Sequence, residues 1–494
     1  MDISNGVNPV FLIAIPLGGA FAIPLFGFIG KNFSKYIALI VSLSLVAIVG
    51  ILIPEVSAHP IVVKIGGFKP PFGINLVVSP LSLFFAGIIA LVGFLVSIYS
   101  VKYIKEGARN NYHMLFLLLL TGSIGVVLTG DIFNIFVFFE ILCISSYALV
   151  AYNRDKNGVE SGIKYLIQGS VGSAFILIGI GLLYGLFGSL NMADIANQIH
   201  SVNSPLLFLA LFLFITGFGV EASIFPLNAW LPDAYSSAPS SISAVLSGFA
   251  SKVGIYAVIR FIWTIFGASS ILHFLAGLGL LTLLIGELSA FKQRDVKRLL
   301  AYSSIAQIGL ILFAISIGTQ GGISGGLFQV LNHAFSKALL FMAVGYMTMK
   351  VGSNDLQDLK GIGRQMPITV FCFLLGTLSL IGFPPFLGFA SKFIIIKSAL
   401  LTQNGYFYFL VGLVLFGTVI EISYFFRVIQ GMYAKTSITQ INEAPLTALV
   451  PIIVLTVLII GIGVYPQIII NFLQLASDNL IDKMGYVNQV LGGF

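Results

Sequence analysis

Ionisable side chains inside apolar stretches are the residues of this sequence best suited to chemistry. The clearest cases are Glu140, Glu221, Lys252, His333, Lys337, Lys392 and Glu421. A charged group at membrane depth costs about 2.5–3.5 kcal/mol on insertion scales, so such groups usually mark an ion or proton path. The chemistry these residue types predict is proton transfer or binding of a small cation.

Some of these groups also have a structural interpretation. Lys252 lies about two turns from the end of its apolar run, so its ammonium could extend to the interface, and Lys397 could do so more easily. Glu421 could pair with a residue of its own helix. We expect Glu287 and Asp295 to lie in or beside a loop.

His333 and Lys337 share a spacing that favours a relay. They are four residues apart in "QVLNHAFSKALLFMAVG", so both lie on one helix face. A proton can pass between two titratable groups so placed, directly or through one or two waters.

The elements that position these groups are membrane-spanning helices. The chain has 494 residues, 58% hydrophobic and only 9% charged, whereas a soluble protein has about a quarter charged. Apolar runs of about 20 residues, enough to span a bilayer, recur along the chain and predict about fourteen helices. Their expected ranges are 9–29, 36–53, 79–101, 112–130, 132–152, 161–187, 205–235, 239–262, 271–290, 299–317, 321–349, 367–400, 406–434 and 446–470.

The cationic residues define an orientation. Most lysines and arginines fall in alternate loops, and the other side holds only Lys64, Lys69, Arg260 and Lys483. By the positive-inside rule the N-terminus is outside, in a cell membrane. The first run, 9–30, has no basic residue before it and is too long for a signal-peptide core, so we expect it to be retained. The net charge of +7 then requires no nucleic-acid partner.

Prolines interrupt two of the expected spans. Pro226 and Pro232 fall in the seventh, and Pro384 and Pro385 fall in the twelfth. Each proline removes a backbone N–H donor and leaves backbone carbonyls without a helical partner. At membrane depth such groups are tolerated only where they are buried in protein or line a water-filled cavity. Breaks five spans apart predict two five-helix repeats, spans four to eight and nine to thirteen, and point to a transport site.

This repeat scheme divides the chain into four parts. They are an N-terminal three-helix segment (1–111), a first repeat (112–262), a second repeat (271–434) and a last span with a short tail (446–494). Cys143 and Cys372 lie in apolar runs without metal-ligand or redox spacing. We therefore expect no cofactor in this chain, and any redox chemistry would belong to another subunit.

The motifs that surround these residues are recognisable. "IFPLNAWLPDAYSSAPSSISAVLSGFASKVGIYAVIR" (224–260), "DVKRLLAYSSIAQIG" (295–309), "NHAFSKALLF" (332–341) and "GFPPFLGFASK" (382–392) resemble the antiporter-like subunits shared by respiratory complex I, Mrp-type sodium/proton antiporters and membrane-bound hydrogenase-type complexes. The resemblance covers nearly the whole chain. It implies an all-α fold of fourteen helices with two inverted repeats, each forming a half-channel, joined by a hydrated polar axis.

The resemblance also implies roles for individual residues. Glu140 matches the family's fifth-helix glutamate, Lys252 its eighth-helix lysine and Lys392 its twelfth-helix gate residue, while His333 and Lys337 match the eleventh-helix relay. One position departs from the family, because Glu221 stands where a lysine is expected.

Three interpretations of Glu221 remain open. If it faces Glu140, repulsion and poor solvation would favour a shared proton, with Lys252 as the compensating cation. Alternatively, Glu140 and Glu221 form an oxygen-rich sodium site with carbonyls freed at the break. In the third interpretation the first half-channel is inactive and only transmits motion.

The expected function is translocation of H⁺, Na⁺ or both, as one subunit of a larger complex. The resemblance implies membrane partners, namely a homologous antiporter-like subunit and small multi-helix subunits, and in some complexes a peripheral iron–sulfur arm. A stand-alone cation/proton antiporter is the alternative. The short tail after the last span mildly favours an Mrp module or a hydrogenase or sulfur-reductase complex over complex I.

Overall fold

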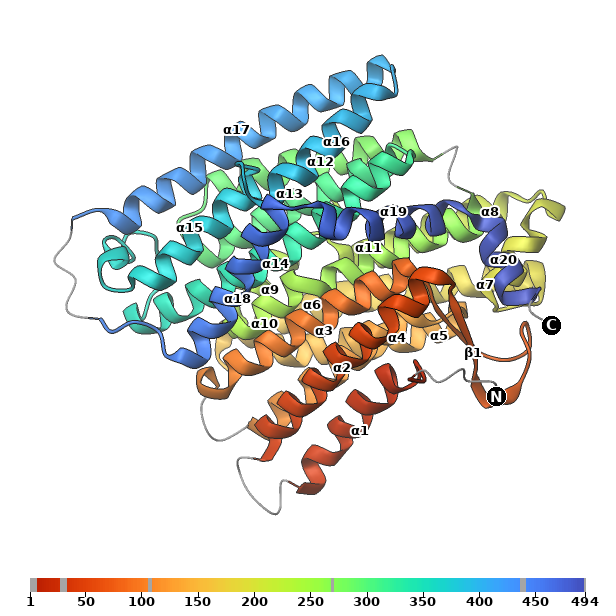
Figure 1. Ribbon diagram of the computed structural model, residues 1–494, viewed down its shortest axis with the longest axis horizontal. Helices are drawn as coiled ribbons and strands as arrows, with labels where there is room; N and C mark the ends of the chain where they lie inside the picture. Colours follow the sequence, from red (N-terminus) through yellow and green to blue (C-terminus); the bar gives the residue numbers. More distant parts are fainter. Residues whose placement is uncertain (1–6, 27–32, 105–108, 268–270, 436–440, 493–494) are drawn as a thin grey trace.

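A single bundle of helices forms the protein (Figure 1). The computed structural model describes residues 7–26, 33–104, 109–267, 271–435 and 441–492. Part of the first expected span, 27–29, therefore lies outside the described residues. The N-terminal part forms α1 (Phe11–Phe26), α2 (Phe33–Ala58), the strands β1 (Ile61–Lys64) and β2 (Asn75–Val78), and α3 (Pro80–Tyr103).

Two further groups of helices correspond to the predicted repeats. The first comprises α4 (Arg109–Leu128), α5 (Ile132–Val150), α6 (Lys156–Phe187), α7 (Met192–Gln198), α8 (Pro205–Ala222), α9 (Leu231–Ser237), α10 (Ser240–Val245) and α11 (Ser251–Arg260). The second comprises α12 (Leu272–Phe291), α13 (Val296–Ser316), α14 (Gln320–Val351), α15 (Pro367–Ile381), α16 (Leu387–Leu401) and α17 (Gly405–Tyr433). The last described part forms α18 (Leu446–Val464), α19 (Gln467–Ile481) and α20 (Lys483–Leu491).

The helices have the length and composition of membrane spans. Twelve in the described part are long and apolar enough to cross a bilayer, with α10, α11 and the π-helical turns beside them counted as one helix, Ser240–Phe266. Two more apolar helices, Phe11–Leu25 and Pro367–Ile381, are shorter. The protein is thus a multi-pass membrane protein, while the total of fourteen spans stays a prediction.

The two broken helices have the same backbone construction. After α8, Ser223 adopts a left-handed conformation (φ 58°), and the peptide bond before Pro226 is cis. After α15, Gly382 is left-handed (φ 90°), and the bond before Pro385 is cis. The second helical half then begins, at α9 with Pro232 in its first turn and at α16. Both predicted interruptions are confirmed, although Pro232 starts a helix rather than breaking one.

A second matched pair of features shows that the repeats are inverted. Asp131 caps α5 and forms a β-bridge with Asn191, and Asp295 caps α13 and forms a β-bridge with Asp355. The first bridge adjoins the hairpin, where Gly130 donates its amide to the carbonyl of Asn75. Because α5 runs away from the hairpin and α13 runs toward it, the same combination of a capping aspartate and a β-bridge occurs on opposite sides of the membrane.

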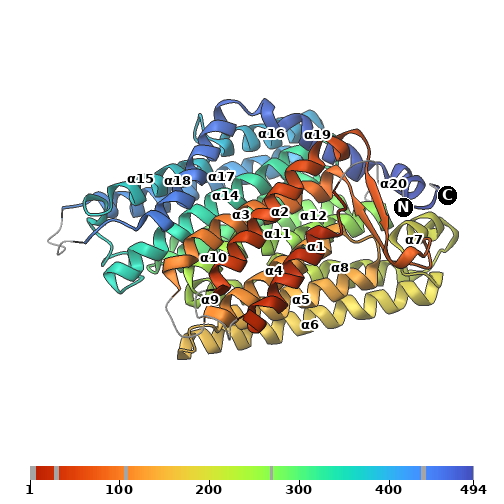
Figure 2. The same ribbon diagram turned by 60° about the horizontal axis from the view of Figure 1, so that its bottom comes forward.

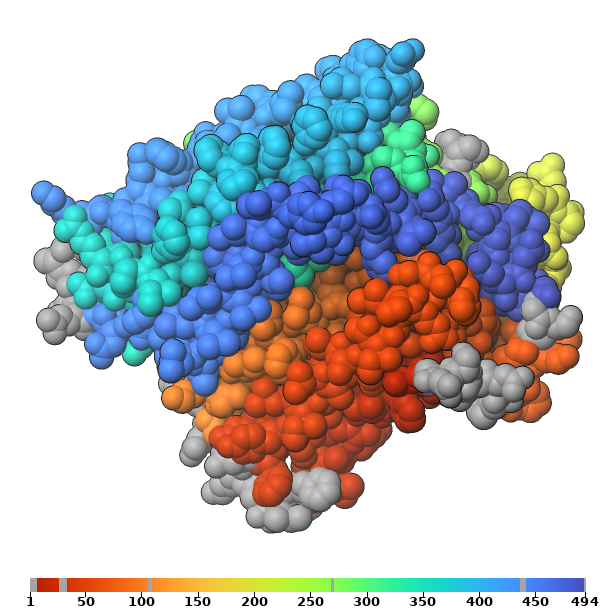
Figure 3. Space-filling model, viewed as in Figure 1, coloured from red at the N-terminus to blue at the C-terminus, as the bar shows by residue number. Residues whose placement is uncertain are grey.

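The side that carries the β1–β2 hairpin is called the hairpin side. The strands pair antiparallel, with Ile61 opposite Val78. The hairpin, α7 and α20 gather at one end of the bundle in two views (Figure 1 and Figure 2). On the same side α19 crosses the bundle between the N-terminal helices and the second repeat, as a blue band in Figure 3. It packs on α3 and α14 and leads into α20, which packs on α7.

Two helices in the described part of the chain are completely buried over the apolar stretch that would cross the membrane. They are Ser240–Phe266 and α14, which carries His333 and Lys337. One expectation about a charged residue is wrong, because Glu287 is not in or beside a loop but buried in α12. Arg260 is buried at the end of α11, within the expected span 239–262 and toward the hairpin side. Glu287 lies near the end of an apolar run, where hydropathy does not separate a last buried turn from a loop.

Candidate functional site

Glu221 lies in the last turn of α8, directly before the first break. Its side chain is 1% exposed. The hydroxyl of Tyr165 on α6 lies 2.8 Å from Oε1 and 2.7 Å from Oε2, so it donates to the carboxylate. The thiol of Cys143 on α5 lies 3.7 Å from Oε2. No cation in the described part of the chain forms an ion pair with Glu221.

Side chains of α6 and of the break itself hold this carboxylate in place. The ring of Trp230 stacks on that of Tyr165, with centroids 3.6 Å apart. Its indole nitrogen donates to the carbonyl of Val220 at 2.8 Å, and Gln168 of α6 donates to the carbonyl of Leu227 at 2.6 Å. Backbone acceptors freed by the break are thus satisfied by protein donors, as membrane depth requires.

The three groups expected to form a first charge cluster are not in contact. Glu140 lies partly exposed on α5, and its Oε1 has no hydrogen-bond partner among the described residues. Lys252 on α11 donates to the carbonyl of Ser247 and lies 3.5 Å from the hydroxyl of Ser251. In the described structure it forms no ion pair with Glu140 or Glu221. The expected pairing of Lys252 with these carboxylates is therefore not met, whereas Glu140 and Glu221 both interact electrostatically with Cys143.

The centre of the molecule holds a cationic group. His333 and Lys337 share one face of α14, as the spacing predicted, and both are completely buried. Lys337 donates to the carbonyl of Leu300 at 2.9 Å. Both ring nitrogens of His333 lack a partner among the described residues. Lys252 and Lys337 are the charged neighbours of this histidine, so the three groups form one electrostatic cluster.

An ion pair occupies the second break. Lys392 of α16 lies 2.8 Å from Oε2 of Glu421 on α17, and both groups are buried. Lys392 also donates to the carbonyl of Ile381, the last residue of α15, at 3.0 Å. Glu421 therefore pairs with another helix, and the expectation of a partner within its own helix is wrong. The broken helix supplies both the lysine and the carbonyl that holds it.

Buried amides extend this ion pair into a hydrogen-bonded chain. Gln307 of α13 donates to Oε1 of Glu421 at 2.7 Å, and Gln329 of α14 donates to Gln307. The oxygen of Gln329 in turn accepts from Ser391 and, at 3.4 Å, from Asn332. Such a chain links the second break to α14, one turn from His333.

Glu287, Tyr165 and Tyr424 belong to the polar interior and were missed from the sequence. Glu287 is 2% exposed, and its Oε2 has no partner among the described residues. It interacts electrostatically with Glu421 and Lys392 and lies beside the hydroxyl of Tyr424. In the sequence, Glu287 could have been found as a carboxylate within the apolar run "LLTLLIGELSAF". The two tyrosines could have been found as phenol hydroxyls within apolar helices.

A polar pocket opens on the side opposite the hairpin, with a volume of about 500 Å³. It lies where α6 and α9 of the first repeat meet the start of α13, and Ser161, Lys164, Asp233 and Arg298 are among its lining residues. Asp233 bridges Lys164 at 3.0 Å and Arg298 at 2.8 Å. Lys164 directly precedes Tyr165 in α6, although Tyr165 itself is not among the residues that line the pocket.

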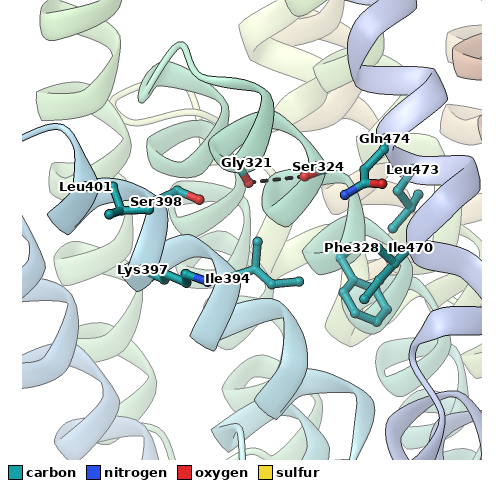
Figure 4. Close-up of a pocket in the computed structure, with 10 residues that line it drawn as sticks. All are labelled: Gly321, Ser324, Phe328, Ile394, Lys397, Ser398, Leu401, Ile470, Leu473 and Gln474. Carbon is teal, nitrogen blue, oxygen red and sulfur yellow. Dashed lines mark hydrogen bonds between the residues drawn. The ribbon is translucent and has the colours of Figure 1, made fainter.

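A second pocket, of about 340 Å³, opens on the hairpin side between α14, α16 and α19 (Figure 4). Lys397 and Ser398 lie toward its mouth on α16, which confirms that Lys397 is exposed near the end of its helix. On α14 and α16, Phe328 and Ile394 are the lining residues farthest from the hairpin-side ends of these helices. Gln329, the next residue of α14, belongs to the amide chain of the second break but is not among the residues that line this pocket.

The described residues show no group of three or more His, Cys, Asp and Glu side chains that could hold a metal ion. Cys143 and Cys372 are both buried and unpaired. The sodium site expected from Glu140 and Glu221 would need both carboxylates at one point. Instead, Glu221 faces two hydrogen donors, a phenol and a thiol.

Comparison with known sequences gives matches along most of the chain. Residues 129–421 match the family described as NADH:quinone oxidoreductase/Mrp antiporter, TM, and residues 63–114 match that of complex I chain 5, N-terminus. NADH-quinone oxidoreductase subunit N of Desulforudis audaxviator is 34% identical, over 95% of this chain and 98% of the relative. An Na⁺/H⁺ antiporter subunit of Alkalihalophilus pseudofirmus is 31% identical, over 87% of this chain and 88% of the relative.

Solved structures show the same arrangement. A chain of the membrane-bound sulfane sulfur reductase, an archaeal respiratory membrane complex, is 40% identical with a TM-score of 0.92, over 98% of this chain and 99% of that one. A chain of the Mrp complex from a Dietzia species has a TM-score of 0.89 at 24% identity, over 97% and 98%, which shows a shared fold.

Proposed function

Since the chain belongs to the NADH:quinone oxidoreductase/Mrp antiporter family, it is an ion-translocating membrane subunit, and we propose that the ion it moves is the proton. The observation that carries this proposal is the buried Lys392–Glu421 pair with its chain of amides. A carboxylate and an ammonium in contact can exchange a proton and separate again. Sodium instead favours several oxygen ligands around one point.

The two pockets support two half-channels of opposite direction, which we place in residues 112–262 and 271–434. The first would open from the polar pocket beside Asp233 to Tyr165 and Glu221. The second would open from Gln329 and Lys392 to the pocket beside Lys397. Lys252, His333 and Lys337 lie between the two halves and would pass the proton across the centre.

The buried carboxylate of the first half-channel, Glu221, has no cationic partner among the described residues, unlike that of the second. The second half keeps its carboxylate beside a lysine, whereas Glu221 has only neutral donors, Tyr165 and Cys143. A buried carboxylate without a cation favours its neutral form. We therefore propose that Glu221 accepts a proton from the polar pocket and releases it when the central cations move.

The proposed ion is tested with the complex purified together with its native partners and placed in liposomes. Internal pH is followed while the complex is driven by its own redox reaction or, if it has none, by a sodium gradient. With a redox driver, we expect proton movement at the same rate with and without sodium at fixed pH. With a sodium driver, sodium movement should stop when Lys392 or Glu421 is neutralised. A redox-driven rate that requires sodium would contradict the proposal.

Entry through the polar pocket is tested by Asp233→Asn. Asp233 is the acceptor that joins Lys164 to Arg298, and its side chain is 22% exposed. Because exposed ion pairs contribute little, we expect a loss of stability below about 1 kcal/mol. Driven proton movement should still fall, because the entrance loses its carboxylate. Asp358→Asn, in an exposed loop, is the matched control, and equal rates in both variants would place the entrance elsewhere.

The chain works with other membrane subunits, because its relatives are parts of multi-subunit complexes. We propose that one partner covers Glu140, which lies partly exposed on α5 between the exposed side chains of Val137 and Ile144. A carboxylate facing lipid alone would be costly, so a partner helix with a cationic or hydrogen-donating side chain fits there.

We further propose a cell-membrane location with the hairpin side and the N-terminus outside, as the distribution of basic residues indicates. The 40% identity to the sulfane sulfur reductase chain favours a respiratory membrane complex, and we propose that this complex also has the peripheral iron–sulfur arm that the family resemblance implies. Identification of the subunits that copurify with this chain tests that choice. Recovery of a fully active single chain would instead support a stand-alone antiporter.

A further inference from the structure

Arg260 is a buried cation that the proposed proton path does not use. It ends α11 and is 3% exposed. Its Nε and Nη1 have no hydrogen-bond partner among the described residues. The helix around it, Ser240–Phe266, is buried inside the chain over its apolar stretch, so the side chain of Arg260 has little access to lipid headgroups.

Arg260 lies between the central lysine and the hairpin side. Lys252, Tyr256 and Arg260 recur at four-residue intervals and follow one side of α11. Eight residues of helix separate Lys252 from Arg260 by about 12 Å. Tyr256 lies between them and donates its hydroxyl to the carbonyl of Val127 at 2.7 Å. A cation moving from Lys252 along this side would therefore reach the guanidinium of Arg260.

The C-terminal helix covers Arg260 from the hairpin side. The guanidinium carbon lies 4.2 Å from the ring centroid of Tyr486 on α20, and Tyr486 is itself buried. Lys483, one turn earlier in α20, donates to the carbonyl of Ile265 at 2.9 Å. Two cations therefore lie at this end of α11, held by an aromatic face and a backbone carbonyl.

The nearby carboxylate does not cancel this charge. Asp131 interacts electrostatically with Tyr486 and accepts the amide of Asn134 at 2.7 Å as the cap of α5. It forms no ion pair with Arg260 in the described structure. A buried guanidinium repels cations and protons, and an arginine is a known means of excluding them in membrane pores.

We propose that Arg260 is an electrostatic barrier that closes the first half-channel toward the hairpin side, so that a proton arriving at Lys252 continues only through the second half. The inference rests on the proposed proton path. It adds a residue whose task is to prevent leakage through a shorter route. Tyr486 is a positioning residue, because its ring packs against the guanidinium of Arg260.

The experiment measures passive proton flux, without any driving reaction, in liposomes containing the complete complex. A potassium diffusion potential is imposed with valinomycin, and internal pH is followed with a trapped dye. We expect Arg260→Gln and Arg260→Met to raise passive flux about tenfold, whereas Arg260→Lys stays close to wild type because the charge is kept. Methionine fills the same length without a polar group, so it serves if the glutamine variant does not assemble.

Tyr486→Ala separates a charge barrier from a steric plug. This variant uncovers Arg260 but keeps its charge, so we expect passive flux near that of wild type. A leak in Tyr486→Ala without a leak in Arg260→Met would overturn the proposal in favour of a plug. Passive proton flux at the wild-type level in the Arg260 variants would also overturn the proposal. If these variants also lost driven transport, Arg260 would belong to the proton path and would not be a barrier.

This outcome is distinct from failure of the proposed function. Passive flux depends only on whether the passage is closed, and it is measured without the driving reaction. If driven transport proved to be sodium movement, a proton leak in Arg260→Met would still identify the barrier.

Discussion

Replacing Lys392 with methionine is expected to reduce driven proton movement about 100-fold, the scale typical of losing a positioned proton-transfer group. The ammonium is the only cation that forms an ion pair with Glu421 in the described structure. It also occupies the carbonyl of Ile381 that the break leaves free. The rate is measured in liposomes with the complex driven as described above.

The same substitution should also lower stability. Removing one partner of a buried pair leaves the other charge uncompensated, at a cost of about 3–5 kcal/mol. Thermal unfolding of the complex in detergent measures this effect. Lys392→Met combined with Glu421→Gln should recover most of the stability but none of the transport.

Lys397→Met is the matched control. This lysine lies five residues later on α16, is exposed, and lines the hairpin-side pocket. We expect less than about a twofold change in rate, because an exposed ammonium is solvated without a partner. Equal losses in the Lys392 and Lys397 variants would mean that positive charge near the outlet, and not the buried pair, controls transport.

Replacing Glu221 with glutamine is the second substitution with a large expected effect. Glutamine keeps the shape and can still accept from Tyr165, but it cannot take up a proton. If Glu221 loads the first half-channel, driven proton movement falls about 100-fold while assembly is retained. Glu221→Lys restores the residue type expected from the family, but it would face the donors Tyr165 and Cys143, so we expect poor assembly as well.

Tyr165→Phe tests the same site without altering the carboxylate. It removes the donor to both oxygens of Glu221 and leaves the ring stacked on Trp230. We expect an intermediate loss of transport and a shifted pH–rate profile, because the charged form of Glu221 loses its main stabilising hydrogen bond. Wild-type transport and an unchanged pH profile in both Glu221→Gln and Tyr165→Phe would favour an inactive first half-channel.

The sequence predicted the helices and their breaks because these depend on local properties. Apolar run length located the helices, and Pro226 and Pro385 marked the breaks. The site was harder, since its contacts join distant helices. Glu421 was recognised as buried, but its pairing with Lys392 depends on how α16 packs against α17.

Other misses have equally specific causes. Tyr165 carries no charge at neutral pH, so a search for buried charges passed over it. Gln307 and Gln329 were visible as amides inside apolar runs, but a neutral amide is not a sign of an ion path until its partner is known. Glu287 lies near the end of an apolar run, where hydropathy does not distinguish a helix end from a loop.

The crossing of α19 and α20 over the hairpin side has a mechanical consequence. Gln320 at the start of α14 donates to Asp478 of α19 at 2.7 Å, while Tyr486 of α20 is seated on Arg260 of the first repeat. One continuous segment therefore fastens both repeats at this side. At the other side they are joined partly by the solvent-accessible link between Asp233 and Arg298. Relative motion of the two repeats would therefore be a hinge rotation about an axis near α19, and it would widen the polar pocket on the opposite side.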